Sequence, residues 1–364
     1  MSVEALIPKL IRASLENDFR TVRSLAIRMV RQVKNTHPKV AEEIAQALEF
    51  HGVGVSTRRS IGIEDSPLDN ESRLSLASVE EPIECKPPIL SKVINESIND
   101  FVNERKNSKK LLSAGLIPAS SILLYGPPGV GKTYLAKYLS GIFNLKFVTL
   151  DLATCISSYL GKTGQNLKSV LNYAREEPTL LLLDEFDAVA KKRDDMSDLG
   201  ELKRIVNVLL KELEDWPPHS ILMAATNHPD LLDPAIWRRF DRVIEIKLPK
   251  EEERLEILKR ELSDFPRDKN TEAFYKLIAN LSSGLSGADL CKLSDRVKRK
   301  AILYDGEPMK IVLQELISLN RIKDSDFNKK FCKLAREYTD LSIRELAGML
   351  GKSHSTVQYY LKGE

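Results

Sequence analysis

The sequence has few of the residues from which disulfide-rich proteins and metal sites are built. Four cysteines are scattered along it without paired spacing: Cys85, Cys155, Cys291 and Cys332. We expect them to be small buried hydrophobic residues in a reducing compartment, because a disulfide or zinc framework needs closely spaced cysteines. The five histidines form no ligand cluster either. A metal site built from the protein alone is therefore not expected.

Long apolar runs and a strong net charge are also missing. No stretch approaches the length of a transmembrane helix. The start, Met1-Ser2-Val3-Glu4-Ala5, lacks the basic and then apolar pattern of a signal peptide, so we expect a cytoplasmic protein. With 55 Lys and Arg against 52 Asp and Glu, the net charge of +3 gives no global field that points to nucleic acid or a membrane.

What is present is the composition of an ordinary core-forming protein, with 42% hydrophobic and 29% charged residues. The 364 residues predict about two to four compact units. Helical periodicity over residues 3–50 predicts a small helical unit, and the loss of periodicity over 51–87 predicts a linker. Further along, apolar runs alternate with helical patterns, which indicates a parallel sheet covered on both faces. The predicted units are 1–50, 51–87, 88–249 with this α/β sheet, 250–320 as a helical lid, and 321–364.

A glycine loop between an apolar run and a helix is the strongest signal in the sequence. Its residues are Gly126, Pro127, Pro128, Gly129, Val130, Gly131, Lys132 and Thr133. Glycines allow positive φ and a close approach of backbone N–H groups to phosphate oxygens, and the following helix adds its positive end. Lys132 is predicted to bind the β- and γ-phosphates, and Thr133 to supply a hydroxyl for Mg²⁺. The loop therefore predicts a site for a nucleoside triphosphate.

Three polar residues follow two later apolar runs. Asp184 and Glu185 come directly after Leu180–Leu183, and Asn227 follows the run 221–226. Ligands of open α/β sheets lie at the carboxyl ends of strands, so Asp184 is predicted to hold Mg²⁺ and Glu185 to activate the attacking water. Asn227 can orient that water or contact the γ-phosphate, although an asparagine before His-Pro is also ordinary turn chemistry.

Two adjacent arginines, Arg238 and Arg239, lie a short distance further on. A guanidinium is planar, always charged and bidentate toward phosphate. Supplied from a neighbouring subunit, it stabilises the charge that develops on the γ-phosphate. In isolation the pair could also be a solvated basic helix end.

Together these motifs resemble the AAA branch of the AAA+ ATPases, the P-loop NTPases with a parallel-sheet core, across roughly residues 88–320. Adjacent arginines are similar to those of katanin, spastin and several bacterial members. The resemblance implies ATP and Mg²⁺ as cofactors and a hexameric ring with the nucleotide between subunits. It also implies that Gly287 and Ala288 line the nucleotide pocket from the lid. A further element, Tyr159-Leu160-Gly161, occupies the position of the family's pore loop, whose aromatic grips an extended polypeptide.

The last segment carries a different pattern. Ala347, Gly351 and Val357 have helix-turn-helix spacing, and residues 321–364 resemble bacterial modules of that kind. If this module binds DNA, the candidate contacts are Ser355, Thr356, Gln358 and Tyr359. Nine basic residues against six acidic ones in 321–364 argue for DNA only weakly, and such modules also bind proteins.

Three functions are consistent with the sequence. The first is an ATP-driven ring motor that remodels or threads a protein substrate, with an effector partner such as a protease implied by the resemblance. The second is a DNA-associated ATPase recruited through residues 321–364, and the third is an ATP-gated scaffold without useful turnover. Glu185 and the two arginines argue against the third, because a scaffold has no need of hydrolytic residues.

Overall fold

The computed structural model describes most of the chain, and it divides into two compact units. The described ranges are 3–15, 19–34, 37–50, 77–158, 163–188, 209, 211, 216–263, 271–304, 308–319, 325–339 and 341–362. The first unit contains residues 1–88, 92–126 and 132–246, and the second contains 89–91, 127–131 and 247–364. The chain therefore passes through the second unit briefly in the middle of the glycine loop.

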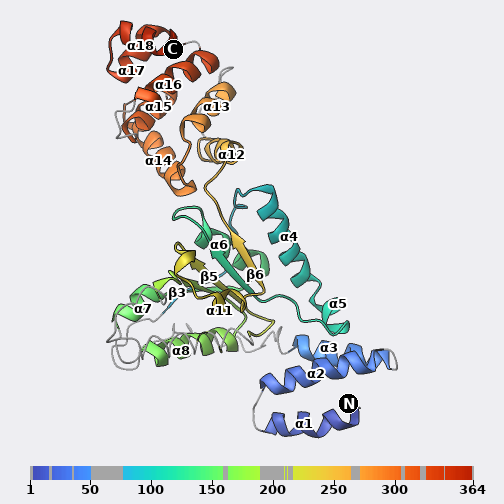
Figure 1. Ribbon diagram of the computed structural model, residues 1–364. Helices are drawn as coiled ribbons and strands as arrows, with labels where there is room; N and C mark the ends of the chain where they lie inside the picture. The colour runs from blue at the N-terminus through green and yellow to red at the C-terminus, as the bar shows by residue number, and fades with distance from the viewer. Residues whose placement is uncertain are drawn as a thin grey trace. The chain divides into compact units, whose positions relative to one another are not determined.

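The first unit is built on a six-stranded sheet with the strand order β1-β3-β4-β5-β2-β6 (Figure 1). All neighbouring strands are parallel except β1, which pairs antiparallel with β3. The strands are β1 Ser78–Glu80, β2 Ser121–Tyr125, β3 Lys146–Asp151, β4 Thr179–Asp184, β5 Ile221–Thr226 and β6 Arg242–Glu245. The predicted parallel sheet of a P-loop core is confirmed. The structure adds one short strand, β1, inside the segment that the sequence predicts to be a linker.

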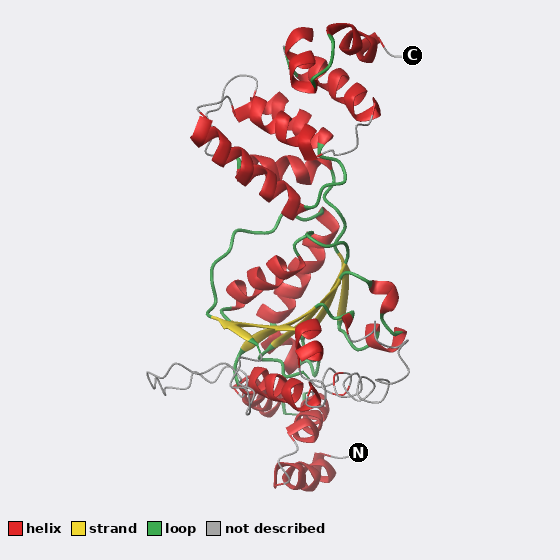
Figure 2. Ribbon diagram, turned by 90° about the vertical axis from the view of Figure 1, so that its left-hand side faces the viewer, coloured by secondary structure: helices red, strands yellow, loops and turns green. Residues whose placement is uncertain are grey.

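Helices cover both faces of this sheet (Figure 2). The residues Leu180–Leu183 of β4 are fully buried, so both faces of the strand need cover. The face that includes Leu181 and Leu183 packs against α8, and α6 also packs on the sheet. The helices between and around the strands are α4 Lys92–Lys106, α5 Ser108–Ser113, α6 Lys132–Phe143, α7 Leu152–Ser158, α8 Thr163–Glu176, the 3₁₀ helix η2 Pro229–Leu231 and α11 Pro234–Trp237.

Strand β2 lies where the connections of this sheet diverge. It lies between β5 and β6, although three strands separate it from β6 along the chain. The chain leaves β2 toward β3 on one side and returns to β6 on the other, so the connections diverge at this strand. Ligands of open α/β sheets bind where the connections diverge, beyond the carboxyl ends of the strands. The glycine loop follows β2 at that end.

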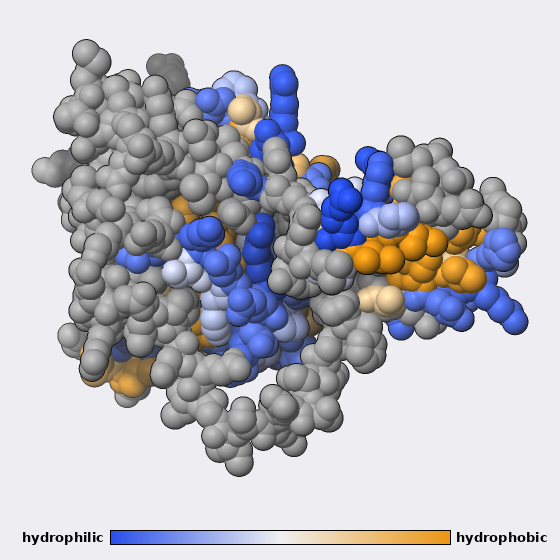
Figure 3. Space-filling model, turned by 90° about the horizontal axis from the view of Figure 1, so that it is seen from below, coloured by the Kyte–Doolittle hydropathy of each residue, from blue (hydrophilic) through white to orange (hydrophobic). Residues whose placement is uncertain are grey.

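Three helices precede the sheet and belong to the same unit: α1 Val3–Leu15, α2 Phe19–Val33 and α3 Pro38–Phe50. They pack in sequence order, and α2 and α3 also contact α5. Arg31 of α2 donates a hydrogen bond from Nε to the carbonyl oxygen of Gly115 over 2.7 Å. Apolar side chains gather on the surface at the right of Figure 3. Of the large apolar residues of these helices, Ile7 and Ile11 of α1 and Val40 of α3 are exposed.

The second unit contains helices and turns but no strand in its described residues. Its helices are α12 Glu251–Glu261, α13 Thr271–Leu281, α14 Gly287–Tyr304, α15 Pro308–Leu319, α16 Ser325–Tyr338, α17 Ile343–Leu350 and α18 His354–Lys362. A single hydrophobic cluster contains residues from α12 to α15 and buried residues from the last three helices, among them Phe331, Leu346 and Val357. The domain boundary expected at residue 320 remains a prediction, and this cluster extends across it. None of the helices in the described ranges combines the length and apolar character needed to span a bilayer.

Candidate nucleotide site

The glycine loop has backbone conformations that only glycine adopts without strain. Gly126, Gly129 and Gly131 have φ values of 143°, 77° and 96°. At Gly126 there is also no room for a side chain, because a Cβ atom would lie 2.0 Å from the carbonyl oxygen of Ile246. That carbonyl follows β6, and the Ile246 N–H donates to Tyr125 O over 2.8 Å, which continues the β2–β6 pairing. The close approach of two strand ends therefore requires a glycine here.

Lys132 begins α6, and its ammonium group is held at the carboxyl ends of two strands. Nζ donates to the carbonyl oxygen of Gly126 and to Oδ1 of Asn227, both over 2.7 Å. Burial lowers the pKa of Lys132, while the carboxylates of Asp184 and Asp187 act in the opposite direction. The structure thus brings Lys132 and Asn227, which are separated by 95 positions, into direct contact.

Thr133 and Asp184 are also distant in the sequence and hydrogen-bonded in the structure. The Thr133 hydroxyl donates to Oδ2 of Asp184 over 3.0 Å, and Oδ1 of the same carboxylate accepts the Glu185 N–H over 2.9 Å. A hydroxyl and a carboxylate side by side are oxygen ligands of the kind that Mg²⁺ prefers. These two side chains fit the metal that the sequence predicts.

Glu185 lies in the turn after β4 with φ of 50°, in the left-handed region. A side chain other than glycine adopts this conformation rarely, and where it persists it marks a turn, strain or a functional constraint. The Glu185 side chain is exposed, whereas Phe186 next to it is buried. The turn therefore presents the carboxylate outward at the same end of the sheet as Lys132.

Asp187 belongs to this group, and sequence reasoning missed it. It is buried, and its Oδ1 accepts hydrogen bonds from Thr226 Oγ1 over 3.0 Å and from the Asn227 N–H over 3.4 Å. Because Asn227 contacts Lys132, Asp187 fixes the end of β5 that carries this amide. One signal for Asp187 is present in the sequence. It is a third acidic residue, two positions after Glu185, at the end of the same apolar run.

Arg238 and Arg239 lie elsewhere on the same scaffold, on the connection between β5 and β6. Both side chains are exposed, and they follow the short helix α11, whose N-cap Asp233 accepts the Ala235 N–H over 2.8 Å. They precede the start of β6, whereas the glycine loop follows the end of the parallel neighbour β2. Within one chain, the arginines and the loop thus lie at opposite ends of the same strand pair.

The middle of the glycine loop contacts the start of α14 within the second unit. The Ala288 N–H donates to Gly129 O over 2.9 Å, and a Cβ on Gly129 would come within 2.5 Å of Ser286 Oγ. Ser286 and Asp289 cap the helix reciprocally, and the hydrogen bond from the Ser286 hydroxyl lowers the pKa of Asp289. The predicted residues Gly287 and Ala288 are therefore next to the loop.

Two predicted elements remain predictions for different reasons. The pore-loop residues Tyr159, Leu160 and Gly161 lie outside the described residues. In the last segment, Gly351 ends α17 with φ of 59° and α18 follows after a short turn. The predicted DNA contacts are all on α18: Ser355, Gln358 and Tyr359 are exposed, and Thr356 is half-buried. Whether these helices form a DNA-binding helix-turn-helix stays a prediction.

Comparison with known proteins points to one family. The sequence model described as "ATPase family associated with various cellular activities (AAA)" matches residues 122–248. The chain is 31% identical over 325 residues to a proteasome-activating nucleotidase from Methanothermobacter thermautotrophicus, covering 76% of this chain and 78% of that protein. It is 38% identical over 191 residues to the 26S proteasome regulatory subunit S10B homolog B from Arabidopsis thaliana, covering 50% of this chain and 47% of that protein.

Among solved structures, the FIGL-1 AAA domain in complex with ADP aligns with a TM-score of 0.54 at 22% identity, covering 73% of this chain and 94% of that one. At this identity the likeness shows the fold alone. The chain spans about half the length of the Arabidopsis relative, but more than three quarters of the Methanothermobacter one. On this similarity, together with the glycine loop and its partners, the chain belongs to the ATPase family associated with various cellular activities, the AAA family.

Proposed function

We propose that this ATPase is a ring motor that uses ATP hydrolysis to remodel or thread a protein substrate. The observation that carries the proposal is the 31% identity over 325 residues to a proteasome-activating nucleotidase, since that similarity extends well beyond the nucleotide core. By the same similarity, we propose a hexameric assembly, a partner effector such as a protease, and a cytoplasmic location.

The nucleotide chemistry follows from the contacts at the end of β2. The N–H groups of the glycine loop and the Lys132 ammonium would bind the phosphates. Thr133 and Asp184 would hold Mg²⁺, which neutralises phosphate charge when bound. Glu185, exposed on its turn, would accept the proton of the attacking water. Asn227 would orient that water, since its amide is already fixed between Lys132 and the backbone bond to Asp187.

The arginines argue for an assembly. Since Arg238 and Arg239 lie at the end of the β2–β6 pair opposite to their own glycine loop, we propose that they act on the nucleotide of a neighbouring subunit. β6 spans about 10 Å between Arg242 and Glu245, and the loop lies further on. A guanidinium that acts on a phosphate must instead make direct contact with it. A ring supplies that contact at every interface.

The first test concerns hydrolysis. The full-length Glu185→Gln variant should bind ATP with unchanged affinity but hydrolyse it about 10²–10⁴-fold more slowly, because the amide cannot accept a proton. Bound nucleotide and phosphate release are measured separately. Wild-type hydrolysis by this variant contradicts the role of Glu185. With ATP, the same variant should retain its protein substrate in a pull-down.

The second test concerns threading. An unfolded model protein should stimulate hydrolysis by the wild-type chain, and Tyr159→Ala should abolish the stimulation while basal hydrolysis remains. Tyr159→Phe is the matched control, since it keeps the aromatic ring that grips a polypeptide. Full stimulation of Tyr159→Ala would refute a threading role for this residue.

A second candidate function is DNA recruitment through α18. The helix buries Val357 and Tyr360 but exposes Ser355, Gln358 and Tyr359, so a polar face stays open to a ligand. This reading predicts salt-sensitive binding of duplex DNA that is lost when residues 321–364 are deleted. If DNA neither binds nor changes hydrolysis at low salt, recruitment to DNA is refuted.

A further inference from the structure

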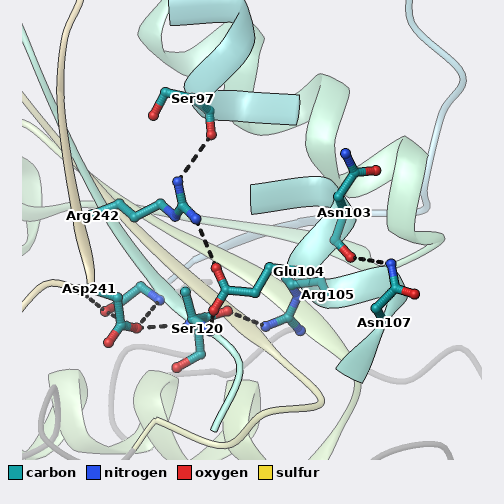
Figure 4. A network of polar contacts seen from close by, with 10 residues as sticks. Ser97, Asn103, Glu104, Arg105, Asn107, Ser120, Asp241 and Arg242 are labelled. Atoms are coloured by element: carbon teal, nitrogen blue, oxygen red, sulfur yellow. Dashed lines mark hydrogen bonds and ion pairs between the residues drawn. The ribbon is translucent and has the colours of Figure 1, made fainter. Parts of the chain in front are cut away.

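Asp241, which follows Arg238-Arg239-Phe240, is hydrogen-bonded to the start of β2, the strand that leads into the glycine loop (Figure 4). Asp241 Oδ2 accepts the N–H groups of Ser120 and Ser121, over 2.8 and 2.9 Å, and the Ser121 hydroxyl over 2.9 Å. The Asp241 N–H donates back to Ser121 Oγ over 2.9 Å. Both serines are buried, so the Asp241 carboxylate satisfies N–H groups that have little access to water.

The next residue, Arg242, makes a second connection to the same strand start. Its NH2 group contacts Glu104 Oε2 of α4 over 2.8 Å, and its NH1 group donates to Ser97 O over 3.3 Å. The other oxygen of Glu104 accepts the Ala119 N–H over 2.8 Å. One carboxylate on α4 thus joins the segment after the arginines to the segment before β2.

Helix α4 is itself held firmly at this point. Arg105 donates to Ala119 O over 2.9 Å and to Pro218 O over 2.7 Å. Its guanidinium lies 5.8 Å from the ring centre of Phe101 and 5.5 Å from that of Phe143. Burial lowers the pKa of Arg105 to about 10, so the group is still charged at neutral pH. Helix α4, which provides Glu104 to the network, is therefore itself fixed to the segments before β2 and β5.

Between the arginine pair and Asp241, Phe240 makes a contact in the core. Phe240 is buried and meets Phe186 edge to face, with ring centres 6.1 Å apart. Phe186 is the neighbour of Glu185. The backbone after Arg239 is thus fixed by Phe240 in the core and by Asp241 at β2, while Arg238 and Arg239 are exposed.

From these contacts we propose that Asp241 is a positioning residue for Arg238 and Arg239. It holds their backbone in register with β2, the strand that leads into the same subunit's glycine loop. The inference rests on the proposed function, in which the arginines act on a neighbour's nucleotide. A displacement of about 1 Å can cost about 100-fold in rate, so losing the carboxylate should lower kcat strongly while each subunit still binds its own ATP.

The experiment compares full-length variants by steady-state ATP hydrolysis. Asp241→Ala should lower kcat about 100-fold and leave KM and ATP affinity unchanged. Asp241→Asn, which keeps an acceptor oxygen, should recover most of the rate. Asp230→Ala is the matched control, because Asp230 is an exposed acid on the same connection between β5 and β6 and should have no effect. Tryptophan fluorescence on urea unfolding checks that each variant is folded.

A double-mutant cycle separates positioning from general structural damage. In the Arg238→Ala/Arg239→Ala background, Asp241→Ala should change kcat no further, because the groups that it positions are gone. An equal loss in both backgrounds overturns the inference, and so does a normal kcat for Asp241→Ala beside an impaired double arginine variant. A double arginine variant with wild-type kcat overturns the proposed role of the arginines instead. Should Asp241→Ala not fold, the same cycle is run with Ser121→Ala, which removes only the hydroxyl contacts.

Discussion

Replacing Gly126, the last residue of the first unit before the glycine loop enters the second, with alanine should destabilise the protein more than the same change at Gly131. Both glycines have positive φ, so an alanine at either position pays the strain of that conformation, about 1–3 kcal/mol. Only Gly126 has a neighbour in the way. Its Cβ would lie 2.0 Å from Ile246 O, whereas among the described residues, chain neighbours apart, no atom lies within 4 Å of a Cβ on Gly131.

The obstruction at Gly126 is backbone, which makes it costly to relieve. Ile246 is bonded through its N–H to Tyr125 O, so a shift of its carbonyl pulls on the pairing of β2 with β6. Overpacking of this kind costs about 1–3 kcal/mol. Strain and overpacking together should lower the free energy of unfolding by about 2–6 kcal/mol in Gly126→Ala, against about 1–3 kcal/mol from strain alone in Gly131→Ala. A domain of ordinary stability has about 5–15 kcal/mol in total, so the larger loss is easily measured.

The assay is urea unfolding without nucleotide, followed by tryptophan fluorescence for the first unit, which contains Gly126, and by circular dichroism for the helical second unit, which contains Gly131. The chain has two tryptophans, Trp216 and Trp237, and both belong to the first unit. Trp216 is buried in the sheet core and Trp237 packs edge to face on Tyr125, so the signal reports the elements around β2. Equal free energies of unfolding for the two variants would refute the steric argument, because strain alone would then explain both.

Three further outcomes are expected elsewhere in the chain. Ser342→Ala removes the reciprocal cap of α17 with Glu345 and should cost about 1 kcal/mol in thermal unfolding followed by circular dichroism; an unchanged midpoint would count against the cap. The pKa of Asp289 is lowered in the folded state. The ionised carboxylate should therefore stabilise the protein above the pKa that it has in the unfolded chain, and this contribution should disappear as the pH falls through the folded-state pKa. Ser286→Ala should weaken this pH dependence in acid unfolding curves. Burial raises the pKa of Cys155 and Cys332 to about 11, so iodoacetamide should modify half-buried Cys85 before Cys155 and Cys332, which should react only as the protein unfolds; rapid labelling of Cys155 or Cys332 in the folded protein would contradict their burial.

The parallel sheet could be predicted because its strands are apolar on both faces. A run such as Leu180–Leu183 has to be covered from two sides, and helical patterns between the runs supply the cover. Strand β1 gave no such signal: it has three residues, and its pairing with β3 joins positions about seventy apart. Short edge strands depend on partners that local periodicity does not reveal.

The nucleotide-site residues could be predicted for a similar reason, since strand ends that follow apolar runs meet at one edge of the sheet. The contacts of Asp241 could not. In sequence it is an acid in a charged stretch, and its partners Ser120 and Ser121 are about 120 positions away. Hydrogen bonds to backbone N–H groups leave no trace in the partner's residue type, so nothing at Ser120 indicates an acceptor.

The turn after β4 links the nucleotide-site residues to the segment that contains the arginines and Asp241. With φ of 50° at Glu185, three successive side chains diverge: Asp184 contacts Thr133, Glu185 is exposed, and Phe186 enters the core against Phe240. A regular extended continuation would alternate the side chains between two faces, and the strain of about 1–3 kcal/mol is offset by the buried Phe186–Phe240 contact. Because Phe240 lies between Arg239 and Asp241, the residue proposed to activate water and the residues proposed to act on a neighbour's phosphate share one rigid support. A change that loosens Phe240 should therefore impair a subunit's own hydrolysis and that of its neighbour together.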